Sequence, residues 1–243
     1  MTGTILNVIA ILVGGGLGML FGSRIPERLK QTVVAGMGLF TAAMGLQMFF
    51  KTGNPLIVLG SLLIGTLLGE WWKIEDGLQS LGIRLEQRFG GADAQAEVQP
   101  AEGRSRFVRG FLVASLLYCV GPMTILGSIN DGLRGDYSLL AVKSVLDGFA
   151  SLAFASTLGL GVLFSILPLF VYQGGISLLA GQISALLSDP MIAEMTATGG
   201  VILFGLALSS LLEIKRIRVG NFLPALVIAP LIVWALARLG IGY

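Results

Sequence analysis

The sequence has no histidine, a single cysteine and few charged residues. Histidine is the commonest metal ligand and the commonest acid–base group in enzymes, so its absence removes the most familiar catalytic chemistries. The lone Cys119 excludes an internal disulfide and a zinc site made of several cysteines. A net charge of +2 is too small to indicate nucleic-acid binding. We therefore expect no enzyme, no metal, no cofactor and no nucleic-acid partner.

Apolar residues dominate the chain. They make up 54% of the 243 positions, while charged residues make up 12%, against about 25% in ordinary soluble domains. The mean hydropathy is +0.86. Because a membrane helix needs roughly 20 mostly apolar residues, we predict an all-α polytopic membrane protein in the lipid bilayer, a single membrane domain over 1–243. Eight transmembrane helices are expected, near residues 4–22, 32–50, 55–72, 108–128, 138–157, 160–186, 196–212 and 220–238.

The placement of lysine and arginine predicts which loops face the cytoplasm. Eight spans put 12 of the 16 basic residues on one side, in the loops after the first, third and seventh spans. Lys51, Arg134 and Arg238 fall on the other side, and Lys143 lies within a span. Basic loops stay cytoplasmic, so both termini should lie outside. The fifth and sixth spans form one apolar tract, divided near Gly159, and joining them would move the last basic loop to the wrong side.

Spans one to three resemble spans six to eight. "TVVAGMGLFTAA" at 32–43 compares with "TATGGVILFGLA" at 196–207, and the pair Gly-Asn opens a span at 53–54 and again at 220–221. An offset of five spans, an odd number, gives the two copies opposite orientations. Inverted repeats are typical of transporter folds, although chance similarity between glycine-rich apolar segments is an alternative. The predicted repeats are 1–72 and 159–243.

Residues 73–106 form the long cytoplasmic loop between spans three and four. Within it, 74–89 has apolar residues at helical spacing, which predicts an amphipathic helix lying on the inner membrane surface. The polar stretch 90–103 predicts a flexible linker. A tether is favoured over a binding loop.

Small residues recur at intervals of four on one face of the first span, at Gly14, Gly18 and Gly22. They allow a neighbouring backbone to approach closely. A phosphate-binding loop would need a preceding strand, which the sequence lacks. We expect helix packing from these glycines, and a homodimer is a reasonable further expectation.

The remaining hairpin, 107–158, is the most polar part of the membrane region. Gly121-Pro122 interrupts the fourth span, and proline removes a backbone donor and clashes with the preceding turn. Carbonyls freed at such a break need partners, which are available where the break is buried or lines a cavity. A simple proline kink and a binding site remain alternatives. The following loop places Asp131 and Asp136 around Arg134, as an ion-attracting mouth or as a solvated turn.

Four polar residues share one face of the fifth span: Lys143, Ser144, Asp147 and Ser151. A lone charge at the bilayer centre costs roughly 2.5–3.5 kcal/mol, and a lysine and an aspartate four residues apart offset part of that by pairing. Lys143 starts near the outer end of the span and could snorkel to the surface, whereas Asp147 lies one turn deeper. The pair is either a structural contact that fixes helix rotation or part of a solute or proton path.

The segment "GPMTILGSINDGLRGDYSLLAVKSVLDGFASLAFASTLGLGVLFS" (121–165) strongly resembles the signature of the domain of unknown function 554 family, whose members are sometimes labelled YdfK-type transport proteins. The opening "GTILNVIAILVGGGLG" and "KRIRVGN" at 215–221 fit as well, so the resemblance covers nearly the whole chain. It implies a multi-pass protein of the bacterial inner membrane. It transfers no substrate and no established active residue.

Two functions are compatible with these observations. The first is a small-solute or ion transporter or channel, in which Asp147 binds a cation or proton and Lys143 is its counter-ion or an anion contact. The second is a non-transporting membrane scaffold or assembly partner, in which the polar face of the fifth span is a helix–helix or dimer contact. The candidate binding residues are Asp147, Lys143, Ser144, Ser151, Pro122, Gly121, Thr124, Ser128, Asn130, Asp131, Asn7 and Gln173, with Ser115 as a further neutral ligand.

Overall fold

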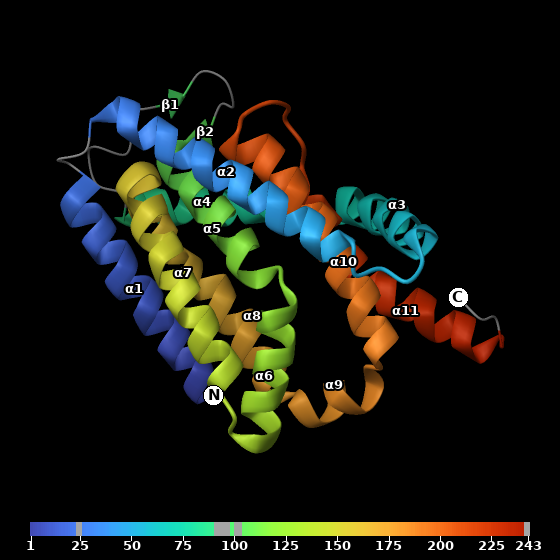
Figure 1. The fold of residues 1–243 in the computed structure, drawn as a ribbon. Coiled ribbons are helices and arrows are strands. Elements are labelled where there is room, and N and C mark those ends of the chain that lie inside the picture. Colours follow the sequence, from blue (N-terminus) through green and yellow to red (C-terminus); the bar gives the residue numbers. More distant parts are fainter. Residues whose placement is uncertain (23–25, 90–97, 100–103, 241–243) are drawn as a thin grey trace.

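The computed structural model describes residues 1–22, 26–89, 98–99 and 104–240. Apart from a two-residue antiparallel pair, β1 (Val98–Gln99) with β2 (Arg104–Ser105), these residues form helices and their connections (Figure 1). The all-helical prediction is confirmed for this part of the chain. The helices are α1 (Thr2–Gly22), α2 (Glu27–Phe49), α3 (Pro55–Trp72), α4 (Ile74–Phe89), α5 (Arg106–Cys119), α6 (Pro122–Arg134), α7 (Ser138–Leu158), η2 (Gly159–Ser165), α8 (Ile166–Leu178), α9 (Ala180–Leu186), α10 (Asp189–Leu206), η3 (Ala207–Leu211), η4 (Val219–Phe222) and α11 (Ala225–Arg238).

Six helical stretches among the described residues are long and apolar enough to cross a membrane. A seventh results if α5 and α6, which are bent by 61° at a short break, form one span. The main difference from the predicted eight spans lies at Ser138–Leu178, a helical tract of 41 residues where the sequence predicts two spans. The six stretches are Thr2–Gly22, Arg28–Phe49, Pro55–Trp72, Ser138–Leu178, Asp189–Leu211 and Val219–Arg238.

The direction of the 41-residue tract reverses after α7, as its contacts with α1 show. Gly159 has a φ of 77°, a left-handed backbone conformation that glycine adopts without strain. Before this turn α7 runs parallel to α1, because Gly3 packs on Leu140 at one end and Gly22 packs on Ser156 at the other. Figure 1 shows the two helices side by side, with the N-terminus at the end where α7 begins.

After the turn, α8 returns along α1 in the opposite direction. Leu163 contacts Gly15 in the second half of α1, whereas Gly174 contacts Met1 at its start. A straight helix of this tract's length would extend about 60 Å, twice the thickness of the hydrocarbon core. The turn at Gly159 instead folds it into two antiparallel arms that both pack on α1.

α2 and α10 cross in opposite directions through a contact between two glycines. Gly38 lies against Leu212 and Gly45 lies against Gly200. A Cβ built on Gly45 would come 2.6 Å from the carbonyl oxygen of Gly200, and one built on Gly200 would come 2.4 Å from the carbonyl oxygen of Gly45. Neither residue can carry a side chain at this separation, so glycine is required on both helices.

α3 and α11 form a third antiparallel pair. Gly60 of α3 faces Ile232 of α11, and Gly65 packs against Ala225, seven residues earlier in the partner helix. Gly69, near the end of α3, lies on the backbone of η4, which precedes α11. Three helices from the first part of the chain are thus each paired, in opposite directions, with a helix from the last part.

Both Gly-Asn turns are held by a buried carboxylate. Glu194 of α10 is 1% exposed and accepts hydrogen bonds from the backbone N–H groups of Gly53 (2.7 Å) and Asn54 (3.1 Å). Glu75 at the start of α4 is 4% exposed and accepts from the N–H of Gly220. In each case a charged oxygen satisfies backbone donors that open a helix, where negative charge is favourable.

α5 lies inside the protein. Every residue from 107 to 116 is buried, whereas α1, α2 and α3 expose large apolar side chains on their outer faces. The two arginines in the first turn of α5 contact other helices: Arg106 donates to the carbonyl of Thr157, and Arg109 donates to the carbonyl of Ser210 (2.9 Å) and pairs with Glu213. A helix enclosed on all sides by protein can contain a break and charges that lipid would not accept.

α4 has the bounds predicted for the amphipathic helix, Ile74–Phe89. Its apolar face packs partly on protein, since Leu78 and Leu85 contact the cluster around Phe111 of α5, while Phe89 is exposed. The prediction of a helix that rests only on the membrane surface is therefore incomplete. Most of the predicted linker 90–103 lies outside the described residues.

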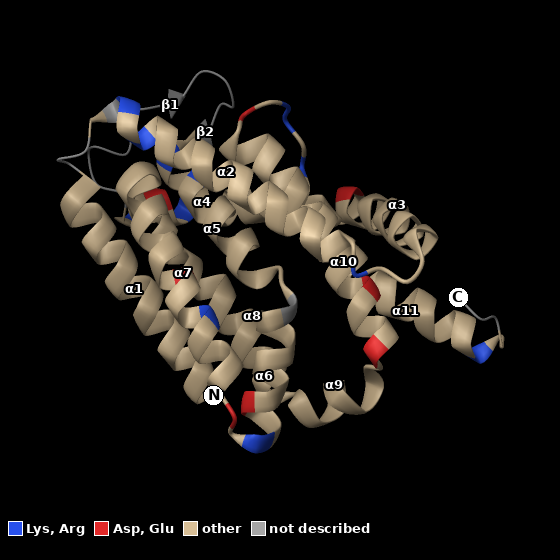
Figure 2. Cartoon of the chain, in the orientation of Figure 1, with Lys and Arg blue, Asp and Glu red and all other residues tan. Residues whose placement is uncertain are grey.

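Charged residues gather at two ends of the molecule (Figure 2), and a few, such as Lys143 and Asp147 of α7, lie between them. Figure 2 shows basic residues at the start of α2 and in the loop after η3 at one end, and acidic and basic residues of the α6–α7 connection at the end where the N-terminus lies. The apolar helices run between these ends.

The α1–α7 contact can be tested with two glycines of the same helix. A Cβ at position 14 would come 2.0 Å from the carbonyl oxygen of Gly148, whereas a Cβ at position 16 meets nothing within 4 Å. We expect Gly14→Ala to cost roughly 1–3 kcal/mol, as overpacking does, and Gly16→Ala to cost much less. Thermal unfolding of detergent-purified protein measures the difference. Equal melting temperatures would show that α1 and α7 do not approach this closely.

We expect Glu194→Ala to destabilise the protein more than Asp189→Ala, because the second carboxylate is exposed on the first turn of the same helix. Removing Glu194 leaves the N–H of Gly53 without its acceptor and takes away one of the two acceptors of the Asn54 N–H, which also donates to the Thr52 hydroxyl. We expect a loss of about 1–3 kcal/mol in the free energy of unfolding. Chemical denaturation in detergent gives the comparison. A Glu194→Ala variant as stable as the Asp189→Ala control would contradict this role.

Candidate functional site

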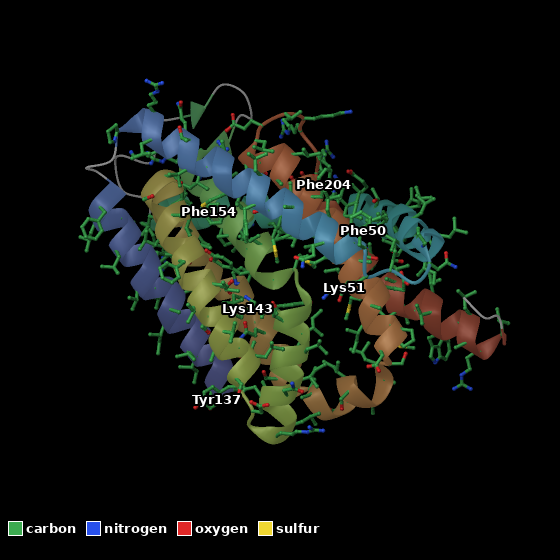
Figure 3. All side chains as sticks on the ribbon, viewed as in Figure 1. Phe50, Lys51, Tyr137, Lys143, Phe154 and Phe204 are labelled. Carbon is green, nitrogen blue, oxygen red and sulfur yellow. The ribbon has the colours of Figure 1, made fainter. Side chains whose placement is uncertain are left out.

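The polar face of α7 points into the protein. Lys143, Ser144, Asp147 and Ser151 are all buried, at 6%, 2%, 9% and 0% exposure. The neighbouring apolar residues of the same helix, such as Phe149, are exposed. The close packing of α7 on α1 determines this orientation, because the glycines of α1 leave room for the α7 backbone. Figure 3 labels Lys143 on the inner part of α7.

Asp147 is the centre of a hydrogen-bonded network across three helices. Its Oδ2 accepts from the ammonium group of Lys143 and from Nδ2 of Asn7 on α1 (2.9 Å). Nδ2 of Asn7 also donates to Oε1 of Gln173 on α8 (3.1 Å), and Gln173 donates to the hydroxyl of Thr4 (3.4 Å). The structure thus brings together four of the predicted residues, which come from positions up to 166 residues apart.

Lys143 does not reach the outer surface, so the snorkelling interpretation is wrong. Its ammonium group turns inward and forms an ion pair with Asp147, and it lies 5.9 Å from the centre of the Tyr118 ring. The pair gives the buried aspartate a counter-charge, and the aromatic ring adds a favourable cation–π contact. A buried charge without such partners would be far more costly.

Two side-chain oxygens around this pair accept no hydrogen bond from the described residues. Asn7 Oδ1 is buried and has no partner among the described residues. The amide orientation is determined by the two acceptors of its Nδ2, Asp147 and Gln173. Both hydrogen bonds of Asp147 go to Oδ2, which leaves Oδ1 without a donor in the described structure. The buried Asn7 Oδ1 costs free energy unless water or a ligand donates to it.

The break in the fourth span lies next to this network. α5 ends at Cys119 and α6 begins at Pro122, as the sequence predicts. The freed carbonyl of Tyr118 accepts a hydrogen bond from the hydroxyl of Thr124 (3.1 Å), and the Tyr118 hydroxyl bonds with Ser151 (2.7 Å). Gly121 has extended backbone angles. The break is thus stabilised locally, and it connects α6 to α7 through Tyr118.

Three predicted neutral ligands use their hydroxyl protons within their own helices or at the break. Ser128 donates to the carbonyl of Thr124, and Ser144 donates to the carbonyl of Leu140 (2.7 Å). Thr124, as described, donates to the backbone at the break. Ser115 is buried and has no hydrogen-bond partner among the described residues. Of these side chains, only Ser115 keeps its hydroxyl fully available.

The two aspartates of the predicted ion-attracting mouth, Asp131 and Asp136, lie in different environments. Asp131 is 3% exposed, and its Oδ2 accepts from the N–H of Gly3 (3.1 Å) and contacts the amino group of Met1 (3.2 Å). Asp136 is exposed and accepts two hydrogen bonds from Ser138 at the start of α7, which lower the pKa of Asp136. Asn130 is half-buried. Asp136 therefore belongs to a solvated turn, whereas Asp131 joins α6 to α1.

Sequence reasoning missed two members of the network, Thr4 and Tyr118. Thr4 lies three residues before Asn7, so it shares a helix face with it, and this spacing could have indicated its position. Tyr118 lies in an apolar run, and Ser115, three residues earlier, is the polar neighbour at helical spacing that could have indicated its position. Among the described residues, no three aspartate, glutamate or cysteine side chains gather as a metal site would require.

Comparison with known proteins places these residues in a family. The family model described as "Protein of unknown function (DUF554)" matches residues 2–234. The chain is 31% identical to the uncharacterized membrane protein YdfK of Bacillus subtilis, with both chains covered completely. It is 33% identical to the uncharacterized protein YqgA of Escherichia coli, over 93% of this chain and 94% of that protein. No solved structure matches the chain. The chain therefore belongs to the DUF554 family, as the resemblance of 121–165 predicts.

Proposed function

We propose that this protein is a small-solute or ion transporter or channel of the bacterial inner membrane, with its binding site at Asp147. The main observation in support is the buried Lys143–Asp147 pair. Asn7 and Gln173 join it from two other helices, and the oxygens Asp147 Oδ1 and Asn7 Oδ1 have no donor among the described residues. Ionisable residues inside membrane helices are expensive and are usually retained for transport or proton transfer.

The residues have distinct roles in this proposal. Asp147 binds the positively charged part of the solute, or a proton. Lys143 is its counter-ion in the empty site and an anion contact when a solute is present. Asn7, Gln173 and Ser151 supply neutral oxygen and amide groups. The break at Gly121-Pro122 gives α6 freedom to move relative to α5, because no continuous backbone ladder joins them.

The helix pairings support an inverted repeat and eight spans. An inverted repeat with a two-fold axis in the membrane plane pairs corresponding helices in opposite directions. α1 with α8, α2 with α10, and α3 with α11 follow this rule. If the fold-back at Gly159 divides Ser138–Leu178 into two spans, the count rises from seven to eight. With eight spans, the basic loops lie in the cytoplasm and both termini outside.

A non-transporting scaffold is the second candidate. The observation that favours it is the same network, because Asp147 and Asn7 connect α7 to α1 in the manner of a structural helix–helix contact. In that case the pair stabilises the fold or an assembly, and a homodimer is one form that such an assembly could take. A test must therefore separate folding from flux.

We expect Asp147→Asn to abolish solute flux, because the amide keeps the shape and loses the charge. The variant also removes the counter-charge of Lys143 and should be less stable, so flux is measured on folded protein isolated by size-exclusion chromatography. Osmotic shrinking and swelling of proteoliposomes measures permeability to a panel of sodium and potassium salts, sugars, polyols and amino acids, and it does not require the substrate to be identified first. Asp136→Asn, an exposed carboxylate outside the network, is the matched control. Full flux in Asp147→Asn would refute the proposed site.

The double variant Lys143→Met with Asp147→Leu separates the two candidates. It replaces the pair with apolar side chains of similar size, which is often neutral for stability. If the protein transports, the variant should fold, elute as the wild type does in size-exclusion chromatography, and show no flux. A folded variant with wild-type flux would show that the pair is only a structural contact, and a wild-type protein without flux would favour the scaffold.

The eight-span arrangement predicts opposite sides for two exposed positions, Asp136 and Lys215. In a Cys119→Ser background, we expect a membrane-impermeant maleimide to label Asp136→Cys from outside the inner membrane. Lys215→Cys should be labelled only after the membrane is opened. If α7 and α8 crossed the membrane as one span, both positions would be labelled from outside.

A further inference from the structure

We infer that the site takes a small zwitterion, a molecule with an ammonium and a carboxylate group a few atoms apart, of the class of the small α-amino acids. The inference rests on the proposed function and names its substrate class. It follows from two observations at the Lys143–Asp147 pair: the charge balance of the site and the positions of its unfilled donors and acceptors.

The net charge of the Lys143–Asp147 pair favours a zwitterion over a simple ion as the ligand. Lys143 and Asp147 are 6% and 9% exposed and are each other's ionic partner. A lone cation bound to Asp147 would displace or crowd the ammonium of Lys143 and leave the buried site with a net positive charge. A lone anion on Lys143 would leave it with a net negative charge. A zwitterion adds one charge of each sign, so the buried site stays neutral.

The groups without a hydrogen-bond partner include both acceptors and donors. Asn7 Oδ1 is a buried acceptor without a partner in the described structure. The hydrogen bonds to Asp147 from Asn7 and Lys143 both end at Oδ2, so Oδ1 of this aspartate can accept from a ligand. An ammonium group of a ligand supplies donors to both. Lys143 has three N–H groups and bonds a single acceptor, Oδ2 of Asp147. Its remaining donors suit a carboxylate of the same ligand.

The packing around the pair guides which amino acids to test first. Gly148, the residue after Asp147, is in backbone contact with Gly14 of α1, two turns beyond Asn7. The centre of the ring of the fully buried Tyr118 lies 5.9 Å from Lys143 Nζ. Because close helix packing and a bulky ring adjoin the pair, we take glycine, alanine and serine as the first ligands to test, before larger amino acids.

The experiment uses detergent-purified protein and thermal unfolding with each ligand at millimolar concentration. The probes are glycine, L-alanine and L-serine, followed by the other common amino acids. Methylammonium chloride and sodium acetate provide the two halves of the zwitterion, and sodium and potassium chloride provide simple cations. A ligand that binds only the folded state raises the melting temperature, and near-saturation corresponds to a shift of about 3 °C or more.

We expect at least one small amino acid to produce this shift and each half-ligand to produce little. Asp147→Asn and Lys143→Met should each abolish the shift, and Asn7→Ala should weaken it. Asp136→Asn should retain it in full. If Asp147→Asn or Lys143→Met fails to fold, Asn7→Ala and the half-ligands still test the site.

Two results would overturn the inference. A shift from sodium, potassium or methylammonium as large as that from the amino acids would identify a simple cation site, and the transporter proposal would survive without the zwitterion. The absence of a shift from every amino acid would show that the unfilled positions hold water, as buried polar sites can. The flux measurement on Asp147→Asn decides the transporter proposal separately in both cases.

Discussion

The close contact between α1 and α7 determines where the polar groups of this protein lie. Glycines on α1 allow the two backbones to meet, as the approach of position 14 to the Gly148 carbonyl shows. The polar face of α7 therefore lies against α1, and Asn7 reaches Asp147 across the contact. α8, folded back on the same helix, brings Gln173 to the other side of Asn7. A larger residue in the contact would separate the charge pair from the amides that stabilise it.

Features that depend on local sequence could be predicted, and features that depend on distant partners could not. Hydropathy and helical spacing are local, so they indicate the apolar helices, the break at Pro122, the amphipathic helix and the polar face of α7. They do not indicate the direction of Lys143, because a long flexible side chain can reach either the surface or the interior. Asp147 determines it, together with Asn7, which lies 140 residues from that aspartate in the chain.

The two Gly-Asn pairs, at 53–54 and 220–221, are stabilised in the same way. A Gly-Asn pair opens a helix on both occasions, and each leaves backbone donors that need a buried acceptor. Glu194 supplies it for the first and Glu75 for the second. These glutamates come from different elements, so the sequence does not show the correspondence. Together with the three antiparallel pairs, this correspondence supports the proposed inverted repeat.

The enclosure of α5 has a consequence for how the protein is made. Its first-turn arginines bond to Thr157 and Ser210, which are synthesised 51 and 101 residues later. Insertion of α5 into lipid by itself is unfavourable, because the helix carries two arginines and is interrupted at Gly121-Pro122. Its final position therefore depends on helices that do not yet exist when it leaves the ribosome. Assembly of this protein must include a late step, in which α5 becomes enclosed only after α7 and α10 have been inserted.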